Sequence, residues 1–272
     1  MIDLGTQPLG HTLSSAEFDA DRIDFLVDAL NLVELPVVLD VFPRHDSYDQ
    51  RGAALARGRA GLTEDGVISD GRIHPDVEIW LRILEQPQWF ASARLIPRPF
   101  TVEASLARIC VAENSSGTVV AVKKGDSLVL RASENDPATE LLAALGDGDA
   151  MEFDGISAPT DLLAEALDAS PTDVTSTAAR LSRIGVEKGR AFDVATAMST
   201  CSAHAEITSV SVRDGKRTAG AHPVAFFDTR RGRIVATSST AADGRRWTTL
   251  SPGSGWRVTS ALAELTARAR AS

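Results

Sequence analysis

The chain has 272 residues, of which 43% are hydrophobic and 24% are charged, and its formal net charge is −9 at pH 7. This length suits one large domain or two smaller ones, and these proportions exclude a disordered or low-complexity chain. The opening residues lack a basic stretch followed by an apolar one, and no window reaches about 18 apolar residues, so we expect a cytoplasmic protein without membrane insertion.

The first part of the chain predicts mostly helices. Apolar residues recur at helical spacing in three segments, and a β-branched run after a proline predicts a strand between the first two of them. The Ser14–Ser15 pair is a candidate cap for the first helix. We expect helices over residues 15–31, 47–62 and 75–86, and a strand over residues 35–42.

After Pro87 the apolar pattern changes from period 3.6 to period 2, which indicates successive antiparallel strands joined by short turns. Asp136 as a cap and Pro137 in the first turn then predict a helix that ends near Gly146. The expected strands cover residues 88–98, 104–114, 118–125 and 126–133, and the helix covers residues 135–148.

The second part of the chain repeats this order of elements. We expect helices over residues 159–170, 171–185 and 187–201, strands over 202–215, 222–232, 233–244 and 245–251, and a last helix over 254–271. Strand runs flanked by separate helices are typical of the α+β class. The repeat predicts two pseudo-symmetric halves, about residues 14–150 and 155–270, which share or abut their sheets.

The segment "DTRRGRIV", residues 228–235, carries three arginines in an acidic chain. Its pattern predicts a hairpin corner in which Gly232 supplies a positive φ. Arg230, Arg231 and Arg233 would then lie exposed at a loop tip and a sheet edge, where charge discourages pairing with other chains.

Charge is unevenly distributed along the chain. Residues 1–212 carry 17 basic and 33 acidic side chains, whereas residues 213–272 carry 11 and 4. An anion- or nucleic-acid-binding surface formed by residues 213–270 is therefore one hypothesis. Arginine-rich turns at a sheet edge are the favoured interpretation, because no aromatic residues are interleaved with the arginines.

Motifs for catalysis or cofactor binding are absent from the sequence. It has no GxxxxGK[ST], HExxH or GxSxG motif, and the glycine-rich "GDGDAM" at residues 146–151 carries aspartates that would repel phosphate. The five histidines are scattered, and Cys110 and Cys201 match no metal-ligand spacing, which indicates two reduced thiols. We therefore predict no enzyme activity, no cofactor and no metal site.

The strand over residues 202–212 has an unusual pattern. One side carries small and apolar residues, and the other carries mixed polar and β-branched residues, so neither resembles an ordinary solvent face. A strand covered by helices on one side and by a partner protein on the other would have this pattern. A strand between two layers of its own chain would also have it.

Three stretches carry a resemblance to a known family. They are "LNLVELPVVLDV" at 30–41, "SARLIPRPF" at 92–100, and "VSVRDGKRTAGAHPVAFFDTRRGRIVATSSTAADGRRWTTLSPGS" at 210–254, followed by a helix that contains Trp256. Together they resemble the EspG family of type VII (ESX) secretion-associated proteins of actinobacteria. The resemblance runs from about residue 14 to the last helix, and its most specific part is the C-terminal stretch.

The resemblance implies a single EspG-like domain over residues 1–272, with a central antiparallel sheet and helical bundles. It also implies a cytosolic, ATP-independent chaperone that binds the tip of the PPE protein in a PE–PPE heterodimer, with 1:1:1 stoichiometry, and keeps this substrate soluble for export. Recognition in the family is attributed to the sheet and the C-terminal helical bundle. On this basis His204, Glu206 and Thr208 are our candidate partner-binding residues, and we expect no nucleic acid as the partner.

Overall fold

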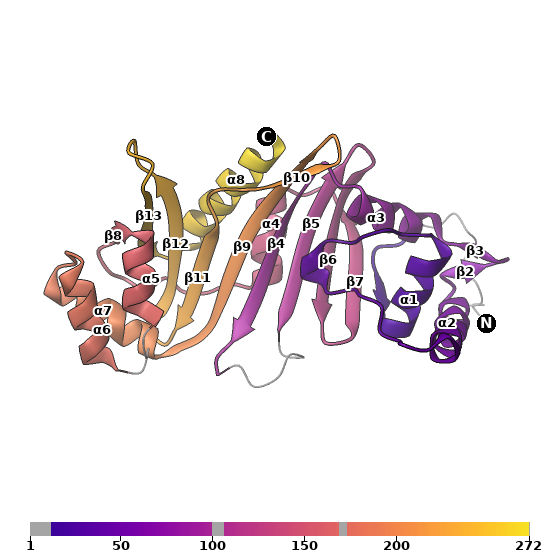
Figure 1. Ribbon diagram of the computed structural model, residues 1–272, viewed down its shortest axis with the longest axis horizontal. Coiled ribbons are helices and arrows are strands. Elements are labelled where there is room, and N and C mark those ends of the chain that lie inside the picture. The colour runs from indigo at the N-terminus through magenta and orange to yellow at the C-terminus, as the bar shows by residue number, and fades with distance from the viewer. Residues whose placement is uncertain (1–11, 100–105, 169–172, 272) are drawn as a thin grey trace, which may run out of the picture.

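The computed structural model describes residues 12–99, 106–168 and 173–271. Within these ranges it contains a mixed α/β fold built on one large antiparallel sheet, with helices on both of its faces (Figure 1). This architecture confirms the predicted fold class.

Eleven strands of the described residues form this sheet in the order β1-β7-β6-β5-β4-β9-β11-β12-β13-β8, with β10 paired to β9. The N-terminal strands are β1 (Ala16–Phe18), β4 (Trp89–Pro97), β5 (Ala107–Asn114), β6 (Gly117–Lys124) and β7 (Ser127–Ser133). The C-terminal strands are β8 (Ile156–Pro159), β9 (Cys201–Arg213), β10 (Lys216–Ala219), β11 (Val224–Thr229), β12 (Gly232–Thr240) and β13 (Arg246–Pro252). A separate hairpin consists of β2 (Ile68–Ser69) and β3 (Arg72–Ile73).

The two halves of the chain meet at their first long strands, β4 and β9. These strands pair antiparallel from Trp89 opposite Ser211 to Pro97 opposite Ala203. On either side of this seam a meander of consecutive strands leads outward and ends with a short added edge strand, β1 or β8. The predicted pseudo-symmetry is therefore present as an approximate two-fold relation about the seam, and one sheet runs through both halves.

The helices divide between the two faces of the sheet (Figure 1). The bundles α1–α3 and α5–α7 lie at opposite ends of one face of the sheet. Helices α4 and α8 pack against each other and against the centre of the opposite face. Their bounds are α1 (Ala20–Ala29), α2 (Tyr48–Glu64), α3 (Pro75–Glu85), α4 (Pro137–Leu145), α5 (Thr160–Asp168), α6 (Val174–Arg183), α7 (Lys188–Ser199) and α8 (Gly255–Ala271).

Three clusters of buried apolar side chains correspond to this arrangement. One lies beneath α1 and α3, and a second lies beneath α5 to α7. The third fills the space between α4, α8 and the centre of the sheet, and it draws on both halves, with Val111 and Leu141 from the first and Phe226 and Leu262 from the second. The burial of these apolar surfaces joins the two halves.

The expected start of the first helix was wrong. The first helix does not begin behind Ser14–Ser15: its cap is Asp19, whose side chain accepts a hydrogen bond from Arg22 N at 2.8 Å. The three residues of β1 pair with β7 instead, because this places Phe18 in the core with 1% of its surface exposed. Tertiary packing here overrides the helical spacing.

The predicted strand over residues 35–42 was also wrong. This segment contains the 3₁₀ helix η1 (Val37–Leu39), which ends at Asp40 in a left-handed conformation with φ of 52°. Within the described part of the chain this β-branched run pairs with no strand, and Leu35 and Leu39 are instead buried in the core beneath α1 and α3. The short strands β2, β3, β8 and β10 were not predicted, because two to four residues carry too little periodicity.

The corner at residues 228–235 is a hairpin, and Gly232 has the predicted positive φ, at 113°. Arg233, however, is not exposed: only 3% of its surface is accessible. It lies opposite Asp228 in the pairing of β11 with β12, and its Nε donates to Asp228 Oδ1 at 2.6 Å. Its guanidinium lies 4.3 Å from the centre of the Phe226 ring.

Arg233 also holds the segment that connects the two halves. Its NH1 donates to the Gly146 carbonyl at 2.8 Å, its backbone N donates to the Asp149 carbonyl at 2.6 Å, and Met151 N donates to its carbonyl at 3.0 Å. The "GDGDAM" sequence therefore connects the two halves of the chain and is hydrogen-bonded to Arg233 of β12. A side chain at Gly148 would collide with the Arg233 guanidinium, with a Cβ to Nε distance of 2.9 Å.

Candidate functional site

Among the residues that the structure describes, no helix covers the centre of one face of the sheet, between the two helical bundles. Along β9 the residues Ala205, Ile207, Ser209 and Ser211 are buried, whereas Glu206 and Thr208 are exposed and His204 is half-buried. Figure 1 shows this part of the sheet, centred on β9, between α5–α7 and α1–α3. The η1 segment contacts β4 at one side of it, and α7 contacts β11 at the other. We call this strip the open face.

The three candidate residues lie together on the open face, each in contact with a neighbouring strand. Glu206 Oε2 accepts from Arg94 NH2 at 2.7 Å, and Thr208 Oγ1 lies 3.1 Å from Ser92 Oγ. The His204 ring stacks on Phe227 of β11, with ring centres 6.2 Å apart. Cross-strand pairs of this kind fix polar side chains on a face that has no helix above it.

His204 also accepts a hydrogen bond at Nδ1 from Arg98 Nε, at 3.3 Å. Burial and the positive charge of Arg98 lower the pKa of the His204 imidazole below its ordinary value, although Glu206 acts in the opposite direction. The imidazole is therefore neutral at pH 7, which suits its role as an acceptor.

Sequence reasoning missed the other wall of this site. A groove of about 380 Å³ runs between the β4–β9 seam and the segment around η1, and its lining includes Val37, Phe42, Arg94, Glu206 and Thr208. We missed this wall because we expected residues 35–42 to form a strand. The alternation of Ser92 and Arg94 in "SARLIPRPF" was the available signal for the polar floor.

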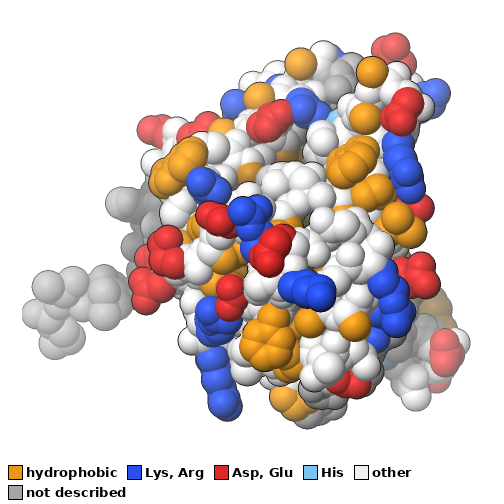
Figure 2. Space-filling view, turned by 90° about the vertical axis from the view of Figure 1, so that its left-hand side faces the viewer, with side chains coloured by type: hydrophobic (Ala, Val, Ile, Leu, Met, Phe, Trp, Pro, Cys, Tyr) orange, Lys and Arg blue, Asp and Glu red, His pale blue; other side chains and the backbone are white. Residues whose placement is uncertain are grey.

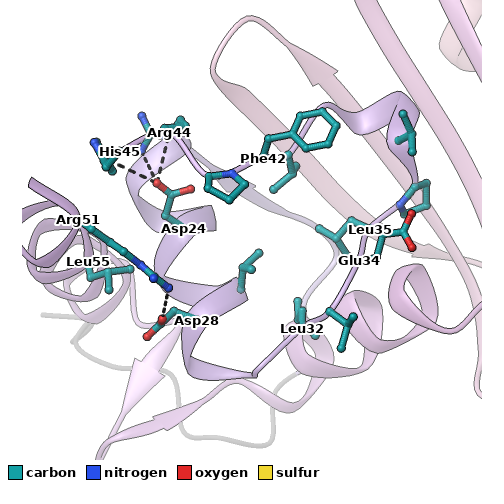
Figure 3. A pocket seen from close by; sticks show the side chains of 16 residues that line it. Asp24, Asp28, Leu32, Glu34, Leu35, Phe42, Arg44, His45, Arg51 and Leu55 are labelled. Carbon is teal, nitrogen blue, oxygen red and sulfur yellow. Dashed lines mark hydrogen bonds and ion pairs between the residues drawn. The ribbon is translucent and has the colours of Figure 1, made fainter. Parts of the chain in front are cut away.

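A second hollow, of about 450 Å³, lies between α1, α2 and the segment that follows α1 (Figure 3). Asp24 and His45 line this hollow, and together with Asp21 they bring possible ligand atoms within 4.8 Å of one another. Arg44 donates to Asp21 at 2.7 Å and to Asp24 at 2.8 Å, and Arg57 donates to Asp21 at 2.7 Å. These arginines compensate both carboxylates, so the arrangement is an ion-pair network.

Some of the positive charge of the C-terminal region is compensated by carboxylates from elsewhere in the chain. Within the described residues several of its arginines pair with carboxylates from other parts of the chain, such as Arg217 with Glu34 at 2.6 Å and Arg231 with Asp193 at 2.9 Å. Figure 2, which faces the end that carries α5–α7, shows acidic, basic and hydrophobic side chains interspersed. These pairs offset part of the charge asymmetry along the sequence, which is consistent with arginine-rich turns.

Neither the site geometry nor the comparisons give positive evidence of catalysis. On the open face the polar side chains are paired with one another across strands, and the half-buried thiol of Cys201 has a pKa raised by burial. None of the described helices combines the length and the apolar composition that a membrane span requires.

Comparison with known proteins gives consistent matches over almost the whole chain. The model of the EspG family matches residues 19–264. The ESX-3 secretion-associated protein EspG3 of Mycolicibacterium smegmatis is 28% identical over 259 residues, covering 93% of this chain and 87% of the relative. EspG3 of Mycobacterium tuberculosis is 27% identical over 271 residues, covering 94% and 92%.

A solved structure supports the same fold. It is the Mycobacterium tuberculosis type VII secretion system chaperone EspG5, in complex with a PE25–PPE41 dimer. Its chain superposes with a TM-score of 0.77 at 17% identity and covers 93% of this chain and 95% of its own. Together with the family match over most of the sequence, this confirms the resemblance, and the chain belongs to the EspG family.

Proposed function

We propose that this chain is a chaperone of type VII secretion that binds a PE–PPE heterodimer and keeps it soluble for export. The observation that carries the proposal is the open face in a chain of the EspG family. At this place no described helix covers one side of the sheet, and α4 and α8 pack on the other side. The EspG5 relative, which has this fold, is complexed with a PE25–PPE41 dimer.

The chemistry of the open face suits reversible capture of a protein. Besides the stacked His204 and Phe227 rings, its side chains include the hydroxyl pair Ser92–Thr208 and the ion pair Arg94–Glu206, so the face is not one large apolar patch. A rigid sheet also loses little conformational entropy when a partner docks on it. We infer that His204, Glu206 and Thr208 contact the partner, and that the two halves act as one domain because the shared core fixes the seam.

The proposal extends to location and stoichiometry. We place the protein in the cytosol, without catalytic activity, as one copy bound to one PE–PPE heterodimer. An uncovered face backed by a buried one allows a single partner to dock on each chain.

The test is co-expression with the PE–PPE pairs encoded in the same genome. We expect at least one pair to co-purify and to elute with the chain as a 1:1:1 complex in size-exclusion chromatography with light scattering. Failure with every encoded pair would refute the proposal.

A matched pair of variants tests the face itself. Thr208→Arg places a long cation on the open face, whereas Thr240→Arg places one at the exposed end of β12. We expect the first substitution to weaken binding by at least about tenfold and the second to leave it unchanged. Equal binding by both variants would contradict the assignment of the open face.

A further inference from the structure

We propose that Val37 and Phe42, on the segment around η1, form a second, apolar wall of the binding site and contact an uncharged apolar segment of the same protein partner. This inference rests on the proposed function and extends the site from the sheet onto the N-terminal half. We call Val37 and Phe42 the apolar rim.

The apolar rim is exposed on a segment that also carries buried apolar side chains. The exposed fractions of Val37 and Phe42 are 63% and 55%, whereas Leu39, between them, is 0% exposed. Figure 3 shows Phe42 beside the sheet strands, on the side of the hollow away from Leu55. Two large apolar side chains are thus presented to solvent at the edge of the groove that contains Arg94, Glu206 and Thr208.

The backbone that carries the rim is fixed to the sheet. Arg108 NH2 lies 3.2 Å from Asp40 Oδ2, and Lys123 Nζ donates to the Asp40 carbonyl at 2.6 Å. Leu35 and Leu39 anchor the same segment in the core beneath α1 and α3. Because these contacts hold the segment without using Val37 or Phe42, the rim is preorganised and loses little entropy when a partner covers it.

The chemistry of the groove indicates what covers the rim. Its charged lining residues form the ion pairs Arg94–Glu206 and Arg108–Asp40, so the groove presents compensated charges. A charged segment would find no unpaired counter-ion there, whereas an apolar segment would bury the rim and leave the ion pairs intact. Since Val37 and Phe42 line the same groove as Glu206 and Thr208, one partner segment can reach both walls.

The test compares two double variants in binding to the PE–PPE pair that the co-expression screen identifies. V37S/F42S removes the rim. V33S/Y48S, the matched control, removes two other exposed apolar side chains, with exposed fractions of 91% and 90%, that do not line the groove. We expect V37S/F42S to raise the Kd at least about tenfold and the control to change it less than about twofold.

Hydrogen exchange provides a second measurement that needs no variant. Backbone amides within residues 37–42 should gain protection when the complex forms, whereas those at the start of α2 should not. Circular dichroism melting checks that the variants fold, which we expect because the substituted side chains are exposed.

The outcomes separate this inference from the proposed function. Wild-type binding that Thr208→Arg weakens but V37S/F42S does not would overturn the apolar rim and leave the chaperone function standing. If no PE–PPE pair binds the wild type, both fail. If V37S/F42S abolishes a dimer of the free chain in light scattering and leaves partner binding intact, the rim is a self-association surface and the proposal is wrong.

Discussion

Replacement of Arg233 by Met should destabilise the protein strongly. Methionine approximates the length of the aliphatic stem but removes the guanidinium, which donates to Asp228 at 2.6 and 3.1 Å and to the Gly146 carbonyl at 2.8 Å. The substitution also removes the contact of the cation with the Phe226 ring. The Asp228 carboxylate and the Gly146 carbonyl then lose their hydrogen-bond donor. Water can replace that donor only poorly, because the site is largely buried.

The magnitude follows from burial. Removal of one partner of a buried ion pair costs about 3–5 kcal/mol of unfolding free energy. The side chain of Asp228 is 29% exposed and can be partly solvated, which places the expected loss at the lower end, about 3 kcal/mol. For a chain of this length that corresponds to a decrease in Tm of roughly 6–9 °C.

Arg231 in the same hairpin is the matched control. Its pair with Asp193 joins side chains that are 41% and 47% exposed, so Arg231→Met should cost less than about 1 kcal/mol. Urea unfolding followed by circular dichroism measures both variants. If Arg233→Met unfolds at the wild-type midpoint, or if the two variants lose equal stability, then Arg233 does not fasten the connection between the halves.

Three further predictions concern single side chains. The pKa of Glu140 is lowered from 4.5 to about 2, mainly by Arg131, so its stabilising contribution is complete above pH 4.5 and is lost as pH falls toward 2. The stability difference between wild type and Glu140→Gln, from urea midpoints, should therefore shrink over that range, and a constant difference would contradict it. Gly232→Ala should lower Tm more than Gly117→Ala, because both have positive φ but only at Gly232 would a Cβ collide with backbone, 2.5 Å from Met151 N. Burial raises the pKa of the Cys110 thiol, so a maleimide at pH 8 should label it only in denaturant, and native labelling would be evidence against its burial.

Most long elements could be predicted from the sequence, because their periodicity extends over several turns or residue pairs. The helix at Pro75–Glu85 combines a proline in its first turn with buried apolar residues at helical spacing, and these local signals agree with the tertiary packing. The strand at Cys201–Arg213 was predicted for the same reason. Its alternation fitted both a strand with one open side and a strand between two layers of its own chain, and the sequence alone could not decide between them.

The errors occurred where a distant partner decides the local structure. Arg233 was expected at the surface because arginines in a turn usually are, and only the fold brings Gly146 and Asp149 against it. The segment with η1 was expected as a strand because Val37 and Val38 are β-branched, but none of the described strands pairs with it. The wall of the groove that this segment forms was missed for the same reason. Whether Val37 and Phe42 are exposed depends on how the segment packs against the sheet.

The seam between β4 and β9 has a consequence for synthesis of the protein on the ribosome. β4 ends at residue 97, but its partner β9 begins only at residue 201. About a hundred further residues must therefore be synthesised before β9 can pair with β4, and until then the edge of β4 stays unpaired. α4 likewise waits for α8, the last described element, before the core behind the sheet can close. A protein proposed to protect aggregation-prone clients is thus itself most exposed to aggregation during its own translation.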